Sequence, residues 1–376
     1  MKQGWELIPF GEVCEISGGS QPPKKNFIYE PKEGYIRLVQ VRDYRTDKYK
    51  TYIPKEMAKK FCSNTDIMIG RYGPPIFGIF NGIEGAYNVA LMKAIPDTKK
   101  LNTQFFRWFL KTNDLVKFVE KSSKRAAGQD GVRKEVLYTY PTPIPPLTEQ
   151  KQIVALLNQA FKAIDQAQQN IEKNIANAKE LFQSKLNAIF SQTGEGWDER
   201  TLGDVCENLD YQRIPITKNK RIEGDIPYYG ASGIVDYVED YLFNEDLLLV
   251  SEDGANLLAR TYPIAFSISG KNWVNNHAHV LKFESMESQL FIEYYLNSIK
   301  LDDYISGMAQ PKLNQKKLNS IIVPFPSSGI QKETVEQIKS LKDMVEKANL
   351  TYKEKLNNLE ELKKSILQKA FNGELT

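Results

Sequence analysis

The second half of the sequence repeats the first at a distance of 181 residues, as from Pro143 to Pro324, and this repeat constrains the fold most. Such self-similarity means that one structural unit occurs twice and that the two copies share an architecture. The matching segments are Pro143-Ile144-Pro145 with Pro324-Phe325-Pro326, Gln150-Lys151 with Gln331-Lys332, Glu180-Leu181 with Glu361-Leu362, and Phe190 with Phe371.

Each copy contains one long amphipathic segment. Apolar residues recur every three or four positions after Thr148, and no Gly or Pro interrupts the pattern before Gly194. This spacing predicts a single helix of about 45 residues, roughly 65 Å long at 1.5 Å per residue. The first stripe comprises Ile153, Leu157, Ala160, Phe161, Ile164, Ala167, Ile171, Ile175, Ala178, Phe182, Leu186 and Ile189, and the second runs from Val335 to Ala370.

A rod of this length needs a partner helix, and the repeat supplies one in the same chain. We expect the two helices to pack antiparallel, with Asp165–Ile171 facing the repeat-equivalent Glu346–Tyr352. The proline cluster before the first helix, Pro141 to Pro146, is expected to stay outside any strand ladder because proline lacks a donor. Thr148 is then expected to cap the helix.

Short apolar runs bounded by Gly, Pro and Asn alternate with short helical patterns in the rest of each copy, which is typical of an α+β domain. The fold prediction is therefore α+β, with two pseudo-twofold-related α/β domains separated by two long antiparallel helices that form a coiled coil. The chain ends should lie close together. The predicted segments are residues 1–142, 143–194, 195–323 and 324–376.

Three cysteines, Cys14, Cys62 and Cys206, are widely separated and odd in number, so neither a disulfide framework nor a zinc site is predicted. The N-terminus has no apolar signal region, and no apolar run reaches membrane-spanning length. These features predict a cytoplasmic protein in a reducing compartment, without contact with a membrane.

Charge is distributed unevenly between the copies. Residues 1–147 hold 24 basic and 15 acidic side chains, whereas residues 197–326 hold 12 basic and 19 acidic ones. The first block has the basic excess expected of a polyanion-binding domain, and the second does not.

The tandem arrangement resembles the specificity subunit of a type I restriction–modification enzyme over essentially the whole chain. The motifs that carry the resemblance are Gly128-Gln129, Ala309-Gln310, Pro143-Ile144-Pro145-Pro146-Leu147-Thr148-Glu149-Gln150 and Phe371-Asn372-Gly373-Glu374-Leu375. The second proline segment departs from the pattern, since Ser327-Ser328-Gly329 stands where the first copy has Pro146-Leu147-Thr148.

The resemblance implies a non-catalytic subunit with two target-recognition domains, each reading one half of a bipartite site in double-stranded DNA. The helices would set the spacer and dock two methylation subunits, and restriction subunits would join in the full complex. No cofactor is expected on this chain, whereas S-adenosylmethionine, ATP and Mg would bind to the partner subunits.

Catalytic signatures are missing from the sequence. A DNA-adenine methyltransferase needs an Asn/Asp-Pro-Pro-aromatic loop. The most similar segment, Gly73-Pro74-Pro75-Ile76, has neither the Asn or Asp at its first position nor the aromatic residue at its last. No Walker loop or Gly-rich nucleotide motif is present. We therefore predict no catalytic residue and no metal site.

Loops between strands hold the residues best suited to contact phosphates and base edges, because Arg, Lys, Asn and Gln supply the required donors. For each residue alone, the structural alternative is an ordinary exposed charge. The predicted DNA-binding set is Lys24, Lys25, Arg42, Arg45, Arg71, Tyr72, Lys124, Arg125, Gln129 and Arg133 in the first copy, and Arg213, Lys218, Lys220, Arg221, Arg260, Lys271, Asn275, Gln310, Lys312 and Asn314 in the second.

Two further motifs could serve either a structural role or a chemical one. His277 and His279 alternate on a predicted strand and should point to opposite faces, which favours a structural role or a base contact over shared metal binding. Glu252-Asp253 is expected to serve a turn or a cytosine contact rather than a nuclease site.

Two other function classes remain open from the sequence. One is a coiled-coil adaptor that holds two protein-binding domains, which the acidic second block permits. The other is a DNA-modifying enzyme whose motif is not recognised, which methylation or nuclease activity of the purified chain would reveal.

Overall fold

A computed structural model describes residues 2–72, 76–123, 130–192, 197–307 and 309–375. The chain divides into two compact units. Unit 1 consists of Met1–Ile171 with Glu354–Thr376, and unit 2 consists of Glu172–Lys353. Each unit therefore contains one mixed domain together with parts of both long helices.

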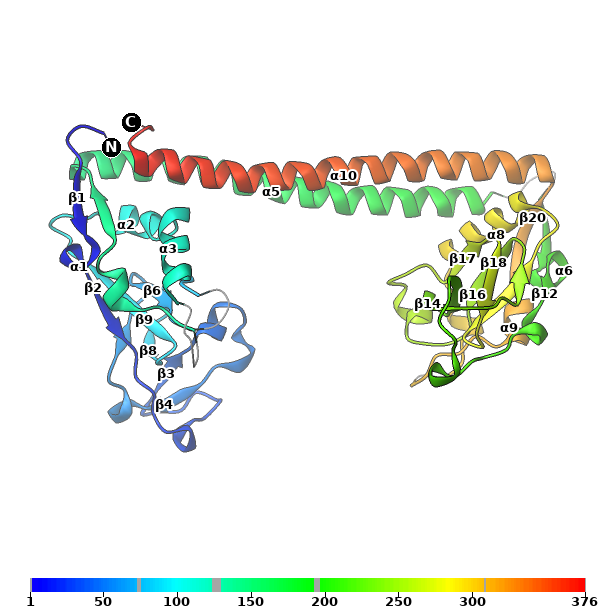
Figure 1. Cartoon of the computed structure of the whole chain (residues 1–376), viewed down its shortest axis with the longest axis horizontal. Coiled ribbons are helices and arrows are strands. Elements are labelled where there is room, and N and C mark those ends of the chain that lie inside the picture. The colour runs from blue at the N-terminus through cyan, green and yellow to red at the C-terminus, as the bar shows by residue number, and fades with distance from the viewer. Residues whose placement is uncertain (1, 73–75, 124–129, 193–196, 308, 376) are drawn as a thin grey trace. The chain divides into compact units, whose positions relative to one another are not determined.

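The two units contain the same three sheets in the same strand order. Figure 1 labels β2, β6 and β9 of unit 1 and β12, β16 and β17 of unit 2. The orders are β2-β9-β6-β7, β4-β3-β8-β5 and β1-β10 in unit 1, and β12-β19-β16-β17, β14-β13-β18-β15 and β11-β20 in unit 2. All pairings are antiparallel except β3 with β8 and the equivalent β13 with β18, which are parallel. The internal repeat in the sequence thus corresponds to a repeat of topology.

Most strands are short. Those of unit 1 are β1 Glu6–Pro9, β2 Cys14–Gly18, β3 Tyr35–Val39, β4 Tyr52–Pro54, β5 Phe61–Cys62, β6 Ile67–Gly70, β7 Ile79–Asn81, β8 Gly85–Tyr87, β9 Leu91–Pro96 and β10 Pro141–Ile144. Those of unit 2 are β11 Trp197–Thr201, β12 Glu207–Asn208, β13 Ile226–Gly230, β14 Gly233–Val238, β15 Phe243–Asn244, β16 Leu247–Ser251, β17 Ala265–Ile268, β18 Lys271–Val274, β19 Ala278–Lys282 and β20 Ile322–Pro326.

Short helices pack on these sheets, and the two long helices complete the units. The helices are α1 Phe10–Val13, α2 Thr103–Phe109, α3 Asn113–Ser123, α4 Lys134–Leu137, α5 Leu147–Phe190, α6 Leu202–Val205, α7 Asn256–Ala259, α8 Met286–Ser298, α9 Gln315–Asn319 and α10 Ser328–Asn372. Within the described residues, no helix is both long and apolar enough to cross a membrane.

The central strands β6 and β16 read as continuous apolar runs because both of their faces are covered. All four residues of β6 and all five of β16 are buried. The core of unit 1 joins Ile67 and Ile69 of β6 to Phe105 of α2, Ile153 of α5 and Leu367 of α10. The long helices therefore belong to the hydrophobic cores of the domains.

The expectation that the proline cluster stays outside a ladder is wrong. Pro141–Ile144 forms β10 and pairs antiparallel with β1, and Ile322–Pro326 pairs in the same way with β11. Each of these sheets has only two strands, so every strand is an edge strand. Prolines at alternate positions, as at Pro141 and Pro143, leave the intervening residues free to form the ladder.

The long helices are continuous over 44 and 45 residues. The first begins at Leu147, so Thr148 lies inside its first turn rather than at the cap. Within unit 1 the pairing is antiparallel, because Asp165 forms an ion pair with Lys363 at 2.9 Å and Gln168 bonds to Glu360. The expected pairing of Asp165–Ile171 with Glu346–Tyr352 is therefore wrong, since Asp165–Ile171 faces the part of α10 around Glu360.

Both chain ends belong to unit 1. A side-chain carbon added at Gly373 would lie 2.5 Å from Cβ of Lys2, so these two residues are in contact. Lys2 also forms an ion pair with Glu149 in the first turn of α5 at 2.7 Å. The expectation that the termini are neighbours is met by the described residues nearest to them.

A buried glutamine fixes each long helix to its domain. The side-chain amide of Gln150 donates to the carbonyls of Lys100 and Pro145, both at 2.8 Å, and its oxygen accepts from the backbone of Asn102 at 2.7 Å. The repeat-equivalent Gln331 donates to Pro326 at 2.7 Å and accepts from the Ser288 hydroxyl at 2.6 Å. Each amide thus links the end of a strand, the start of a long helix and a domain helix.

This arrangement predicts that Gln150→Leu destabilises unit 1 by about 1–3 kcal/mol or more, because buried backbone groups lose their only side-chain partner. Equilibrium denaturant unfolding measures the change. Gln152→Leu, on the exposed face of the same turn, is the matched control and should have little effect. Equal stability of both variants would show that Gln150 does not hold the helix in place.

Candidate DNA interface

Two equivalent short turns present exposed lysines. Lys24 and Lys25 lie in the 3-10 turn Lys24–Asn26 of unit 1, and Lys218 and Lys220 lie in the corresponding turn Lys218–Lys220 of unit 2. All four side chains are exposed. Each unit therefore has a cationic turn between its equivalent strands, β2 and β3 in unit 1 and β12 and β13 in unit 2, although the net charges of the two copies differ.

Unit 1 presents further predicted residues on its loops. Arg42 and Arg45 are exposed, and Arg42 donates to the Thr51 hydroxyl at 2.9 Å. Arg71 is half-buried after β6 with its guanidinium 5.0 Å from the ring centre of Tyr72, and Arg133 is exposed before α4. Lys124, Arg125 and Gln129 lie outside the described residues.

Arg71 and Arg133 line one cleft of about 240 Å³ in unit 1, together with Lys134 and the apolar side chains of Ile16 and Met92. Three cationic side chains and one carboxylate, Glu135, border the space. A cleft with this charge balance can accept an anionic group such as a DNA phosphate.

Four predicted residues of unit 2 are engaged inside the protein. Arg260 donates to the carbonyls of Leu296 and Ile299 at the end of α8, at 3.3 and 2.9 Å. Arg221 donates to Asp236 at 2.8 Å and to Ile216 at 3.0 Å. Asn275 is buried and accepts from the backbone of His277, and Arg213 belongs to the charged network described below. These four side chains have structural partners in this conformation.

The remaining predicted residues of unit 2 are exposed. Lys271 lies 4.7 Å from the ring centre of Tyr241. Gln310, Lys312 and Asn314 follow one another at alternate positions in the segment Ser306–Asn314, in which residue 308 lies outside the described residues. Asn314 caps α9 by accepting from the backbone of Lys317 at 3.0 Å. The structure therefore brings three predicted contacts together on one loop.

Exposed tyrosines lie beside the cationic loops and are not part of the predicted DNA-binding set. Tyr29 is 67% and Tyr211 is 75% exposed. Aromatic side chains on a polar loop can stack on bases or contact thymine methyl groups. Their signal in the sequence is an aromatic residue within a polar stretch, as in Asp210-Tyr211-Gln212.

A charged network lies behind the Ser306–Asn314 loop. Arg213 forms ion pairs with Glu252 at 2.7 Å and Asp210 at 3.3 Å, and Lys312 binds Glu252 at 3.1 Å. His279 bonds to Asp210 through Nδ1 at 2.5 Å. The side chain of His279 on β19 is fully buried, whereas His277 lies in the turn before β19, is exposed and pairs with Asp253 at 2.8 Å. The expectation that both histidines lie on one strand and point to opposite faces is wrong, because residues i and i+2 of a strand share a face and His277 precedes the strand.

The environment of these carboxylates favours their ionised forms. Burial opposes ionisation of Asp210, but bonding to His279, the charge of that ring and the Val280 backbone together hold its pKa below the usual value. For Glu252, burial is likewise outweighed by Arg213, His279 and Lys312, and its pKa is lowered. In the structure Glu252 pairs with Arg213 and Lys312, and Asp253 pairs with His277.

Ligand atoms of Asp210, Glu252 and His279 lie within 4.8 Å of one another. Arg213 and Lys312 already neutralise the two carboxylates, so this geometry is that of an internal ion network. The thiols of the chain are also inert: burial raises the pKa of Cys14 and of Cys206 to about 12 and that of Cys62 to about 11.

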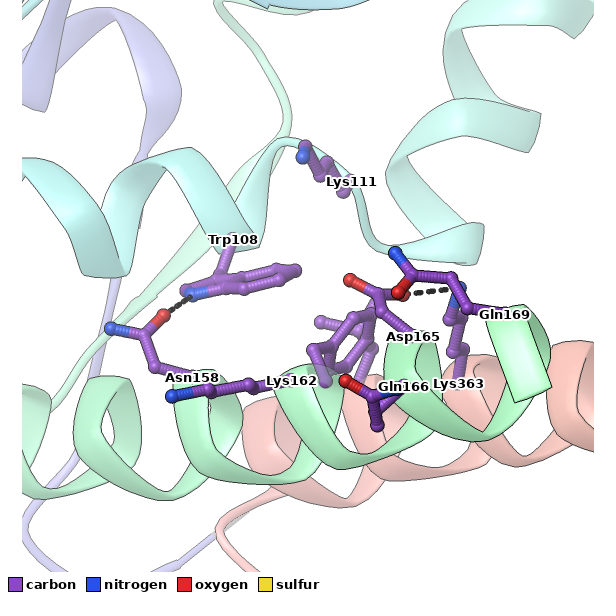
Figure 2. Close-up of a pocket in the computed structure, with 10 residues that line it drawn as sticks. Trp108, Lys111, Asn158, Lys162, Asp165, Gln166, Gln169 and Lys363 are labelled. Atoms are coloured by element: carbon purple, nitrogen blue, oxygen red, sulfur yellow. Dashed lines mark hydrogen bonds and ion pairs between the residues drawn. The ribbon is translucent and has the colours of Figure 1, made fainter.

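A second surface in unit 1 is the groove between α2 and α5, shown in Figure 2. Trp108 packs on Phe161 with ring centres 4.4 Å apart and donates to Asn158 at 3.1 Å, while Lys363 of α10 binds Asp165. The groove has a volume of about 700 Å³, and Lys111 borders it. Its lining is mostly polar, which is suited to a protein surface rather than to a small apolar ligand.

Comparison with known proteins decides the family. Residues 2–176 and 194–360 each match the model of the type I restriction modification DNA specificity domain. The chain belongs to the type I restriction–modification specificity family. The role of such a chain in its enzyme is DNA recognition without catalysis, as the resemblance of the sequence implied.

Individual relatives agree with this assignment. The MjaVIII specificity subunit of Methanocaldococcus jannaschii is 24% identical over 414 residues, covering 99% of this chain and 93% of that protein. A candidate type I specificity subunit of Haemophilus influenzae, S.HindORF215P, is 31% identical over 185 residues, which is 44% of this chain and 48% of that protein.

Solved structures share the fold of the specificity family. A chain from a study of complex assembly and conformational transition of the type I restriction–modification system has a TM-score of 0.79 at 17% identity, with 100% of this chain and 99% of that chain covered. The HsdS subunit of Thermoanaerobacter tengcongensis has a TM-score of 0.63 at 18% identity, with 100% and 98% covered. The α+β prediction with two sheet-containing domains and long helices is confirmed.

The lowered pKa values lead to a prediction about pH. The ionised Asp210 stabilises the fold above its unfolded pKa of about 4, and this stabilisation is lost as the pH falls through the folded pKa. Asp210→Asn should cost about 3–5 kcal/mol near neutral pH, because the charges of Arg213 and His279 lose a buried partner. The difference from the unmodified chain should shrink as the pH falls from 6 to 3.

Urea unfolding at a series of pH values measures this difference. Asp198→Asn is the control, because the Asp198 side chain is 71% exposed and pairs only with Arg200 in the described residues. A stability difference for Asp210→Asn that does not change with pH would show that its charge does not stabilise the fold.

Proposed function

We propose that each unit carries one target-recognition domain and that each domain reads one half of a bipartite site in double-stranded DNA. The observation that carries this proposal is the repeated three-sheet fold with different loop charges: one scaffold occurs twice, and its exposed loops differ. Two domains with the same fold but different exposed loops are suited to reading two different half-sites.

The proposed recognition domains comprise residues 1–142 and 195–323, and residues 143–194 and 324–376 form the two spacer segments. DNA contact is proposed for the exposed loop residues and for the cleft that Arg71 and Arg133 border. Lys24, Lys25, Lys218 and Lys220 would bind phosphates, which fix the position of the protein on the duplex. Gln310 and Asn314 have amide groups of the kind that read adenine edges.

The long helices are proposed to set the distance between the two half-sites. Support comes from their continuity over 44 and 45 residues and from the buried glutamines that fix each helix start to a domain. A continuous helix transmits a fixed length of 1.5 Å per residue. A spacer determined in this way depends on helix length and not on loop sequence.

Two methylation subunits are the proposed partners of the helices, with restriction subunits in the full complex. Large apolar side chains of the long helices are exposed, which is typical of docking surfaces: Leu156, Leu181, Met344, Leu350 and Leu362. The polar groove beside Trp108 offers a further contact surface. S-adenosylmethionine, ATP and Mg are assigned to the partners, and the three free cysteines fit a cytoplasmic location.

Mapping of modified DNA bases in the host, with and without this gene, tests the proposed function. Modification at one bipartite motif should disappear on deletion and return when the gene is supplied on a plasmid. The purified chain alone should neither methylate nor cut DNA. A modification pattern that does not depend on the gene, or catalysis by the chain alone, would contradict the proposal.

A further inference from the structure

Both units attach the same loop by the same backbone contacts. The Val132 amide donates to the Arg71 carbonyl at 3.0 Å in unit 1, and the Leu313 amide donates to the Glu252 carbonyl at 2.8 Å in unit 2. The next residues form matching bridges, Tyr72 with Gly131 and Asp253 with Lys312. The segments around Val132 and Leu313 are therefore anchored by equivalent backbone contacts.

The side chains behind the two loops differ completely. On β19, His279 lies opposite Val250 of β16. Met92 takes the same position on β9, where it lies opposite Ile69 of β6. Unit 2 fills the space beside His279 with Asp210, Glu252 and Arg213, whereas unit 1 has the cleft of about 240 Å³ beside Met92.

His279 has two acceptors and no donor at its ring nitrogens. Nδ1 lies 2.5 Å from the Asp210 carboxylate, and Nε2 lies 2.7 Å from the Leu313 carbonyl. A carbonyl oxygen and an ionised carboxylate can only accept, so both ring nitrogens must carry a proton. The geometry points to a buried imidazolium that bonds directly to the backbone of the loop.

The loop is anchored on its other side by the same network. Lys312 binds Glu252 at 3.1 Å, and the Gly254 amide donates to the Pro311 carbonyl at 3.0 Å. Ser306 and Lys312 exchange two backbone bonds of 2.8 and 2.9 Å. Gln310, Lys312 and Asn314 are thus presented from a loop that is fixed at both of its ends.

We propose that His279, Glu252, Asp210 and Arg213 are positioning residues that hold the Ser306–Asn314 loop for recognition of the half-site read by unit 2. The proposal rests on the proposed DNA-recognition function and adds which buried residues control it. Cys206, whose thiol is affected by the charge of Asp210, also lies close to this network, and the pair of Asp253 with His277 adjoins Glu252. Specific base contacts require donors held in fixed positions, and a mobile loop would discriminate less well.

The test uses the full chain assembled with its methylation subunits. His279→Met gives unit 2 the side chain that unit 1 has at this position, and Glu252→Gln keeps shape while removing charge. Glu245→Gln is the matched control, because Glu245 pairs with Lys282 at the opposite end of β19. Modified sites are mapped for each complex, and binding to duplexes with single-base changes in either half-site is measured.

Discrimination against base changes in one half-site should fall about five-fold or more in both network variants, in line with the energy of one bidentate base contact. Discrimination in the other half-site and the spacer should stay unchanged, as should both half-sites in the control. A general loss of stability would weaken both halves together, which separates a positioning role from a structural one. Glu252→Gln provides the answer if His279→Met does not fold.

Two results would overturn the positioning role: full discrimination at both half-sites in His279→Met and Glu252→Gln, or an equal loss at both. An unmodified complex that recognises no bipartite site would instead overturn the proposed function. The two failures are therefore distinguishable in the same experiment.

Discussion

The attachment of each long helix to its domain is the constraint on which the rest of the structure depends. Gln150 and Gln331 place one amide where a strand ends, a long helix begins and a domain helix starts. Because these bonds are buried, a helix that moved away would leave backbone groups without partners. The apolar contacts of Ile153, Leu157 and Leu367 then add the hydrophobic part of the same junction.

Equivalent junctions support surfaces that differ in charge. Each unit has a lysine turn before its second sheet, but the space beside Met92 is an open cleft bordered by cations in unit 1, whereas the space beside His279 is a closed ion network in unit 2. In unit 2 the carboxylates of Asp210 and Glu252 are paired with Arg213, Lys312 and His279, so these side chains neutralise one another within the protein.

Much of the architecture could be predicted from the sequence because it rests on periodicity and repetition. The apolar stripes predicted both long helices, and the 181-residue repeat predicted two domains of one fold. The β10 strand could not be predicted, because its prolines are tolerated only where both neighbours in a sheet are edge strands. The pairing of the two long helices was also predicted wrongly. The apolar stripe shows which face of each helix is buried, but not which heptads of the two helices lie opposite each other.

The candidate site was less predictable than the fold. In the sequence, Arg213, Arg260 and Lys218 are all basic residues of polar segments. In the structure, each of the two arginines bonds to a residue 39 positions further along the chain, whereas Lys218 is exposed. The network of Asp210, Glu252 and His279 joins the 3-10 turn Asp210–Gln212, the end of β16 and strand β19, which only the fold brings together. The two histidines were also placed wrongly, since residues i and i+2 of one strand share a face and His277 lies in the turn before β19.

The central claim is that two separate readers are held at a distance set by helix length. Its most direct test removes one heptad from each helix where the two face each other in unit 1, Asp165–Ile171 with Asn357–Lys363, so that the stripes keep their phase. Seven residues at 1.5 Å correspond to roughly 10 Å, or about three base pairs. The measurement is a genome-wide map of modified sites in a strain that supplies the methylation subunit. The account predicts unchanged half-sites with a shorter spacer, and modification that persists at the original spacing would contradict it.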